Sequence, residues 1–511
     1  MDGMGLIYHS SLRYKQGQII YTKKVLSRIG IMVDLIPTIY PFTIKHLSKS
    51  IRTGELLPSE LTGLCLDRIK KLNNILNSFI TVRNEEEIFE FAKRCDKRVN
   101  QNDHLHPLHG IPYSIKDMIQ TKHLKFTAGS KFYSNYVSNT TASIVKILNK
   151  KGAILLGTNN LNEFASGITG KNSIYGDSKN PWDLSRISGG SSGGSAVAVT
   201  SGMVVFSLGT DTGGSVRVPA SLCGLVGMKP TFGLISTSDV FPLSPSLDHI
   251  GWLTRSVWDA NLIFKSLCED KNCMKVKKNV MFTHERLRAS KLVIGIPNGY
   301  FLKVIDSRIK KMFIDFLRIV SQSTISVQNF EIEHTNNFFS SWKKVRLYEA
   351  FMIHADRLES NTGQFGSDVK KMLVEGAHIT VDEYIQAKKQ IKKIRHEFMK
   401  LFTSGINAIL IPTTVILAPK LRKVDINIDG LQLNVRNALL RNTVLFNSIG
   451  LPAITIPLGF VNEKGIMLPV GLQIIGPYYG DRLVLSVAQK IEELVGLNRM
   501  VNPVIRKDVQ F

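Results

Sequence analysis

The sequence predicts an α/β fold, one large domain with a mixed, mostly parallel central β-sheet between layers of α-helices. Helical and strand-like segments interleave along the whole chain, as this architecture requires. The β-branched runs at residues 408–411, 453–456 and 470–475 lack clean alternation, which favours strands covered on both faces. Although 511 residues usually suggest two or more domains, no linker, low-complexity stretch or internal repeat divides the chain.

The N-terminal third predicts several elements in order. Residues 1–31 are interpreted as a basic extension, either disordered or a misassigned start, and residues 32–511 as the domain proper. Helical periodicity marks residues 44–51 and 59–76, and Pro58-Ser59-Glu60 is a helix-start signal for the second. A strand is expected at 80–82, helices at 84–99 and 142–150, and a buried strand at 153–156.

Two similar glycine–serine clusters lie within residues 188–224. The first reads GGSSGGS over residues 189–195, and the second reads TDTGGS over residues 210–215. Glycine pairs tolerate positive φ and leave the backbone amides open to a ligand. Residues 196–200 predict a short helix, and residues 203–208 predict a buried strand that leads into the second cluster. This order of strand, glycine turn, serine and helix makes Ser215 a candidate nucleophile beside oxyanion-binding amides.

Two other interpretations compete with this one. Gly/Ser runs often serve as flexible linkers, but twin clusters around an apolar segment are unlike a linker. Residues 190–194 also satisfy the Gly-x-Ser-x-Gly nucleophile elbow, which would nominate Ser192. That motif needs a β-strand running directly into it, whereas residues 180–186 read as a polar, proline-broken loop.

A candidate base lies upstream, in the extended run Tyr113-Ser114-Ile115-Lys116-Asp117. In an alternating strand, Ser114 and Lys116 share one face. A lysine confined to a polar interior can lose its proton at neutral pH, because desolvation disfavours the ammonium form. Taken alone, Lys116 is more simply a solvated charge.

Together these residues resemble the amidase signature family. Residues 110–117 are similar to its Gly-Ile-Pro-x-x-x-Lys-Asp segment, residues 189–194 to its Gly-Gly-Ser-Ser-Gly-Gly segment, and residues 209–219 to its Gly-Thr/Ser-Asp-x-Gly-Gly-Ser-x-Arg-x-Pro segment. The likeness extends from about residue 47 to residue 493, and the fold that it implies is the α/β architecture predicted above.

The resemblance implies a Ser–cis-Ser–Lys triad, and the motif matches assign three residues of this sequence to it. The catalytic residues are Lys116 as the base, Ser191 as the bridging serine after a cis peptide bond from Gly190, and Ser215 as the nucleophile. The implied oxyanion hole consists of the amides of Thr212, Gly213, Gly214 and Ser215, with Ser192, Asp211 and Arg217 in supporting positions. Asp211 and Arg217 are expected to order the loop as a pair. No metal or organic cofactor is implied.

The charge is the unusual feature of the composition. Lys plus Arg number 65 against 41 Asp plus Glu, a net charge of +24, which favours anionic partners such as nucleic acid. The basic residues are spread out and no RNA-binding motif accompanies them, so we interpret them as solvated helix faces. No run is long enough to span a bilayer, and residues 1–34 lack a signal-peptide apolar region. The five scattered cysteines suit a reducing compartment, and we expect a cytoplasmic protein.

The expected function is hydrolysis of a small carboxylic amide to the carboxylate and ammonia, by the chain alone or as a homodimer. One alternative is the A subunit of an aminoacyl-tRNA amidotransferase, a glutaminase acting with partner subunits, and another is a non-enzymatic binding protein on an amidase scaffold. Residues 344–354 lack the Tyr-Asp-Gly-x-Arg-Tyr-Gly element that A subunits tend to carry, and residues 440–452 are similar to free-standing hydrolases. The positive charge favours the tRNA-dependent alternative. The helix-rich residues 340–400 are expected to form a wall of the substrate pocket.

Overall fold

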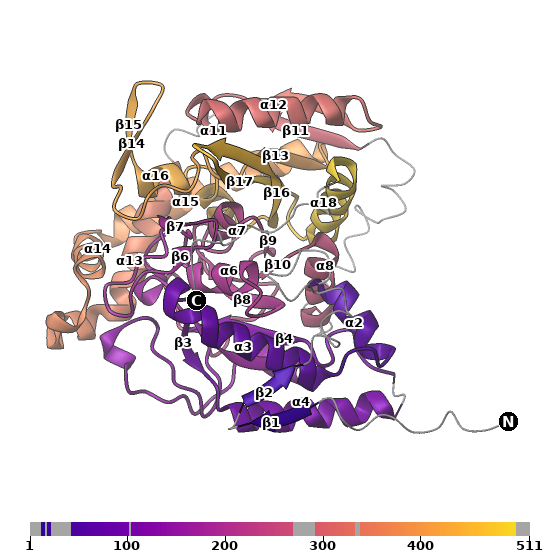
Figure 1. Cartoon of the computed structure of the whole chain (residues 1–511). Helices are drawn as coiled ribbons and strands as arrows, with labels where there is room; N and C mark the ends of the chain where they lie inside the picture. Colours follow the sequence, from indigo (N-terminus) through magenta and orange to yellow (C-terminus); the bar gives the residue numbers. More distant parts are fainter. Residues whose placement is uncertain are drawn as a thin grey trace.

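An eleven-stranded sheet runs through the whole molecule (Figure 1). The computed structural model describes residues 42–101, 104–268, 292–332 and 338–496, together with the backbone of residues 12–15 and 18–21. Across the sheet the strands are β12 (Ser326–Phe330), β11 (Val293–Pro297), β13 (Ala408–Pro412), β17 (Ile466–Ile475), β16 (Ala453–Glu463), β9 (Val226–Lys229), β10 (His249–Thr254), β8 (Phe206–Asp211), β4 (Pro112–Lys116), β5 (Ile154–Asn159) and β3 (Phe79–Val82). Three two-stranded sheets pair β1 (Leu12–Lys15) with β2 (Gln18–Tyr21), β6 (Lys179–Asn180) with β7 (Asp183–Ile187), and β14 (Asp425–Ile428) with β15 (Leu431–Asn434).

The predicted α/β class with a mixed central sheet is confirmed, and its parallel pairs form two groups. Strands β12, β11 and β13 are parallel neighbours, as are β8, β4 and β5. Every pair from β13 through β17, β16, β9 and β10 to β8 is antiparallel, as is the edge pair of β5 and β3. Antiparallel pairs are thus more numerous than the sequence predicts, in part because β16 and β17 are joined by a tight turn that permits only an antiparallel neighbour.

Helices cover both faces of this sheet. They are α2 (Ile44–Arg52), α3 (Pro58–Leu76), α4 (Glu85–Asn100), α5 (Ser143–Lys150), α6 (Gly193–Thr200), α7 (Arg217–Cys223), α8 (Val257–Leu267), α11 (Tyr300–Lys303), α12 (Ser307–Ser321), α13 (Phe338–Ser360), α14 (Ser367–Ala377), α15 (Val381–Thr403), α16 (Val435–Leu440), α17 (Val444–Ser448) and α18 (Asp481–Val495). Figure 1 shows α6 and α7 on one side of the central strands and α8 and α18 on the other. Every residue of β4, β5 and β8 is buried, which explains why these strands lack an alternating pattern.

Local signals in the sequence fix several helix ends. The predicted start of α3 is confirmed, because Pro58 is its first residue and the Glu60 carboxylate accepts a hydrogen bond from the Leu57 N–H at 2.9 Å. The same helix ends at Asn77, whose φ of 51° is the left-handed conformation that asparagine tolerates. The side chain of Asp306 caps α12, and Thr380 and Glu383 form a capping box at the start of α15.

The predicted extension lies largely outside the described residues. Of residues 1–31, the structure describes only the backbone of β1 and β2, which form an antiparallel pair. Cys65, Cys95 and Cys223 are buried free thiols, whereas Cys268 is disulfide-bonded. A reducing compartment would keep all of the cysteines as free thiols, so this disulfide bond differs from that prediction.

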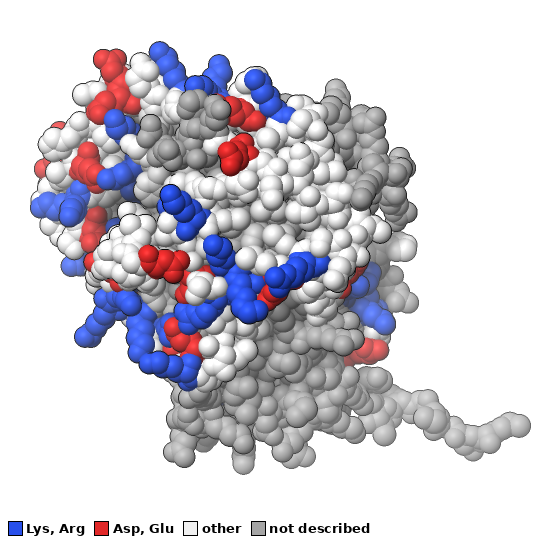
Figure 2. All heavy atoms as spheres, turned by 90° about the horizontal axis from the view of Figure 1, so that it is seen from above, with Lys and Arg blue, Asp and Glu red and all other residues white. Residues whose placement is uncertain are grey.

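The charged side chains on one face of the molecule are of both signs. On the face seen in Figure 2, Lys and Arg side chains are interspersed with Asp and Glu, in agreement with solvated helix faces. No helix in the described part of the chain is long and apolar enough to cross a bilayer.

One test of the packing uses Gly194, in the first turn of α6. A Cβ here would approach the backbone oxygen of Ser78 at 2.4 Å and the backbone nitrogen and oxygen of Asn160 at 2.6 Å. Helix propensity alone predicts that Gly194→Ala stabilises the protein by up to about 1 kcal/mol. We expect destabilisation of about 1–3 kcal/mol instead, because backbone atoms of two other segments cannot move aside individually.

Thermal unfolding measures this effect, and Gly363→Ala is the matched control. Apart from its chain neighbours, no described residue has an atom within 4 Å of a Cβ built at Gly363, so this variant should melt within a degree or two of the parent. A Gly194→Ala protein that melts at or above the parental temperature would contradict the packing described for α6.

Candidate active site

The amine of Lys116 lies at the end of β4, enclosed by the protein. Its Nζ is 2.6 Å from Ser191 Oγ and 2.8 Å from Thr210 Oγ1, and the side chain has no exposed surface. No carboxylate in the described residues lies within ion-pair distance of it. Burial lowers the pKa of Lys116 to about 7, although the charges of Asp211 and Asp248 oppose this shift. The structure therefore provides a lysine that is substantially neutral near neutral pH.

Ser191 reaches this amine from the first glycine–serine cluster. The peptide bond from Gly190 to Ser191 is cis, as the family resemblance implies. Helix α6 begins two residues later, and Ser191 is fully buried between its start and β8. The Thr210 hydroxyl, on β8, is a second partner of the lysine to which the sequence motifs assign no role.

Ser192 does not occupy a nucleophile elbow. Its hydroxyl donates to the Thr210 carbonyl at 3.2 Å, and the side chain is fully buried. The irregular loop predicted before this cluster is wrong, because β7 (Asp183–Ile187) occupies that position. This strand pairs with β6 in a small sheet and forms one antiparallel bridge from Arg186 to Lys420. It does not lead from the main sheet into a strand-to-helix turn.

Ser215 lines a cavity of about 590 Å³. Thr212 and Gly213 line the same cavity, together with residues of α13 and α14. The prediction that residues 340–400 form a pocket wall is thus confirmed for residues 342–375, whereas residues 376–400 do not line the cavity. A backbone hydrogen bond of 3.1 Å from the Ser192 N–H to the Ser215 carbonyl joins the two clusters. In the described residues no hydrogen bond joins the Ser191 and Ser215 hydroxyls, a looseness that is common in active sites without substrate.

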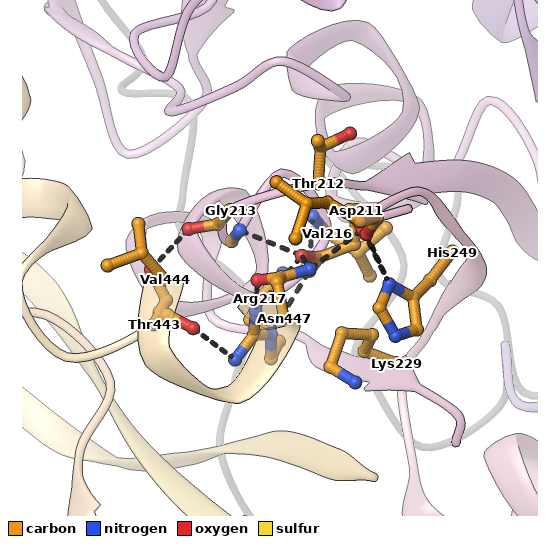
Figure 3. Close-up of polar contacts among 12 residues, drawn as sticks. Asp211, Thr212, Gly213, Val216, Arg217, Lys229, His249, Thr443, Val444 and Asn447 are labelled. Atoms are coloured by element: carbon orange, nitrogen blue, oxygen red, sulfur yellow. Dashed lines mark hydrogen bonds and ion pairs between the residues drawn. The ribbon is translucent and has the colours of Figure 1, made fainter. Parts of the chain in front are cut away.

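The carboxylate of Asp211 organises the turn that carries Ser215 (Figure 3). It accepts from the backbone N–H groups of Gly214 at 2.7 Å and Val216 at 3.1 Å. Arg217 adds a bidentate ion pair, with Nε 3.1 Å and Nη2 2.9 Å from the two carboxylate oxygens, and both side chains are fully buried. Burial alone would raise the pKa of Asp211, but the charge and hydrogen bonds of Arg217 hold it well below its usual value. The predicted pair is thus formed, and the carboxylate stays ionised.

A distant segment completes this cluster. Arg217 also donates to the Thr443 carbonyl and to the side-chain oxygens of Asn447 and Gln473. Asn447 in turn donates from its amide to the backbone and carboxylate oxygens of Asp211, both at 2.8 Å. The sequence motifs assign these three residues no role, and the only available signal is the Phe-Asn pair before Gly-Leu-Pro. Their positions depend on the pairing of β17 and the placement of α17, which a local motif does not predict.

The carbonyl groups of the turn accept hydrogen bonds from two other segments. Thr443 Oγ1 donates to the Gly213 carbonyl at 2.6 Å, and Trp342 Nε1 donates to the Thr212 carbonyl at 3.2 Å. Within the described part of the chain, the N–H groups of Thr212, Gly213 and Ser215 have no acceptor, and these residues line the cavity. Such free amides can hold a developing oxyanion.

Gly214 does not fit its predicted place in the oxyanion hole. Its N–H already donates to Asp211 Oδ1, and it is not among the residues that line the cavity. The prediction from the sequence takes the four consecutive amides of residues 212–215 as one group. The φ of 129° at Gly214, however, turns this part of the backbone toward the buried Asp211 carboxylate.

His249 and Asp248 contact different parts of this turn. Asp248 accepts from the Thr212 hydroxyl at 2.6 Å. His249 Nδ1 lies 2.7 Å from the Leu247 carbonyl and 3.2 Å from the Asp211 carbonyl, so it carries the proton, because both partners are acceptors. Burial lowers the pKa of His249 well below its usual value. As the sequence predicts, the two side chains do not form a Ser-His-Asp triad.

Comparison with known proteins identifies the family. A family model described as Amidase matches residues 60–485, which is most of the chain. The chain belongs to the amidase signature family. It is therefore a hydrolase of carbon–nitrogen amide bonds, and the predicted enzyme class is confirmed.

The similarity to individual members of the family extends over nearly their full length. The A subunit of glutamyl-tRNA(Gln) amidotransferase from Coxiella burnetii (strain Dugway 5J108-111) is 33% identical over 479 residues, 88% of this chain and 97% of that protein. A crystal structure of an amidase superposes with a TM-score of 0.80 at 30% identity, covering 88% of this chain and 99% of the other. The A subunit of glutamyl-tRNA(Gln) amidotransferase from Thermotoga maritima gives a TM-score of 0.71 at 32% identity, covering 88% and 94%.

The Asp211–Arg217 pair provides a stability test of this site. Arg217→Met leaves a fully buried carboxylate without its ion-pair partner, which should cost about 3–5 kcal/mol of unfolding free energy. Arg308→Met removes an arginine that pairs with Asp306 at 2.7 Å but is 42% exposed, and it should cost less than about 1 kcal/mol. Denaturant unfolding of the two variants measures the difference, and equal losses would show that Arg217 does not hold the turn together.

Proposed function

We propose that this chain hydrolyses carboxylic amides through an acyl-enzyme on Ser215, with Ser191 and Lys116 as its proton relay. The observation that carries the proposal is the 2.6 Å contact between Lys116 Nζ and Ser191 Oγ, in a site with no exposed surface. A neutral amine there can accept a proton, which an ammonium ion cannot. The free amides of Thr212, Gly213 and Ser215 lie beside the proposed nucleophile in the same cavity.

The proposed reaction uses these groups in the following order. Lys116 takes the proton of Ser191 as Ser191 takes that of Ser215, and the Ser215 oxygen attacks the amide carbonyl carbon. The carbonyl electrons move to an oxyanion that the turn amides bind, and one such donor is typically worth about 3 kcal/mol of barrier. The carbon–nitrogen bond breaks as the relay returns the proton to the leaving nitrogen. Water then attacks the ester by the same relay and releases the carboxylate with Ser215 restored.

This assignment predicts how the rate depends on pH. The active form has Lys116 neutral, so kcat/KM should rise with pH through about 7 and then level off. Lys116→Arg should be as inactive as Lys116→Ala, because a guanidinium stays protonated. Initial rates of ammonia release across the pH range measure both effects. Near-parental activity of the arginine variant would show that Lys116 is not the base.

The glutaminase role in a tRNA-dependent amidotransferase is the second candidate. It is favoured by the relatives named as A subunits of glutamyl-tRNA(Gln) amidotransferase, which the chain matches over 97% of their length, and by the net charge of +24. A free-standing hydrolase is favoured by the absence of the Tyr-Asp-Gly-x-Arg-Tyr-Gly element from residues 344–354. Both candidates use the same triad and differ in substrate and in partners.

An assay of the purified chain separates the two candidates. The chain alone is incubated with acetamide, benzamide and glutamine, with Ser215→Ala as the inactive control. A free-standing hydrolase releases ammonia from the simple amides without other components. Release from glutamine only, and only after partner subunits and charged tRNA are added, would establish the amidotransferase role.

A further inference from the structure

Arg346 is a buried cation in the wall of the active-site cavity. It lies on α13, lines the same cavity as Ser215, and is only 9% exposed. Arginine is almost never buried in a folded protein unless it is paired. The groups that contact this guanidinium therefore indicate the role of Arg346.

Among the residues that the structure describes, no anionic group pairs with Arg346. None of the carboxylates in the described residues lies within ion-pair distance, and Nε has no hydrogen-bond partner. Its contacts are Nη1 to the Met372 sulfur at 3.2 Å and the guanidinium over the Trp342 ring at 5.2 Å. Burial and the nearby charge of Arg436 lower the pKa of Arg346 to about 9, although the charge of Glu375 opposes this shift. A thioether and an indole face do not replace an anion.

The same tryptophan connects Arg346 with the nucleophile turn. One face of the Trp342 ring contacts the guanidinium, while its Nε1 donates to the Thr212 carbonyl at 3.2 Å. The ring also closes on Gly213, where an added Cβ would lie 2.7 Å from Trp342 Cζ2. Arg346 is thus one indole ring away from the turn of Ser215, which places it within reach of the acyl side of a short substrate.

The rest of the cavity wall is positive as well. Its cationic residues outnumber its acidic ones, with Lys171, Lys343, Arg346, Lys371, Lys423 and Arg436 against Asp368 and Glu375. Glu375 is already paired with Lys343. A cavity with this balance attracts an anionic substrate and leaves Arg346 as the buried group that binds it bidentately.

We infer that Arg346 binds a carboxylate of the substrate, so that the cavity selects short amides whose acyl chain ends in a carboxylate over neutral amides. This inference rests on the proposed amide hydrolysis and adds a specificity-determining residue to it. The substrate carboxylate is the ion-pair partner that no described residue provides to the guanidinium. Arg346 thereby fixes the distance between this carboxylate and the amide carbonyl beside Ser215.

The test compares two amides that differ only in this group. Glutaramate carries a carboxylate where pentanamide carries a methyl group, and kcat/KM is measured for both through ammonia release. Arg346→Met should lower kcat/KM for glutaramate by about 30-fold or more, mainly through KM, because a buried charge loses its partner. Pentanamide turnover should stay within about threefold of the parent, since it does not engage the arginine.

Two further variants define the effect. Arg346→Lys keeps the charge without the planar fork and should retain part of the preference. Lys344→Met is the matched control on α13, because Lys344 pairs with Glu383 and does not line the cavity, and it should leave both rates unchanged. Equal losses on both amides in Arg346→Met, or a parent that does not prefer glutaramate, would overturn the inference.

A binding measurement separates this inference from the proposed function. Calorimetry with glutaramate on Ser215→Ala should show binding that disappears in the Ser215→Ala, Arg346→Met double variant. Arginine-dependent binding without ammonia release by the parent would contradict free-standing hydrolysis and leave the carboxylate site standing. Turnover of pentanamide without arginine-dependent binding would leave the hydrolase standing and refute the carboxylate site.

Discussion

The removal of the Lys116 amine from water is the constraint on which the account of this site depends. A buried ammonium needs a counter-ion, and within the described residues this lysine has only the hydroxyls of Ser191 and Thr210. With its pKa lowered to about 7, the amine is neutral in a large share of molecules at physiological pH. The strands β4 and β8 around it are fully buried, so the same packing that forms the sheet also lowers the pKa of this amine.

Asp211 is a second buried charge and, unlike Lys116, it is surrounded by groups that stabilise its charged form. Asp211 receives Arg217, Asn447 and backbone donors, so it remains ionised and holds the turn in place. Asp211 takes the Gly214 N–H as one of its donors, while Thr443 and Trp342 donate to the neighbouring carbonyls. The amides left without an acceptor in the described structure are those of Thr212, Gly213 and Ser215, on the cavity side.

The motifs predict the local parts of this arrangement and not the contacts between distant segments. Lys116, Ser191 and Ser215 lie in continuous sequence motifs, and the α/β class follows from the interleaved helix and strand periodicities. The exception of Gly214 depends on one backbone angle, and the partners Asn447 and Gln473 reach Arg217 only through the order of strands in the sheet. Arg346 gives no signal in the sequence, because an arginine on a polar helix is normally solvated, and only its burial without an anion distinguishes it.

Family membership fixes the reaction class, and the identity of the reacting groups is the central claim that an experiment must decide. The most direct measurement is the rate at which a fluorophosphonate labels the protein across pH, with the labelled peptide identified by mass spectrometry. The account predicts labelling of Ser215 at a rate that rises through about pH 7, with no such rise in Lys116→Ala. Labelling of Ser192, or a rate on Ser215 that is independent of pH and of Lys116, would contradict it.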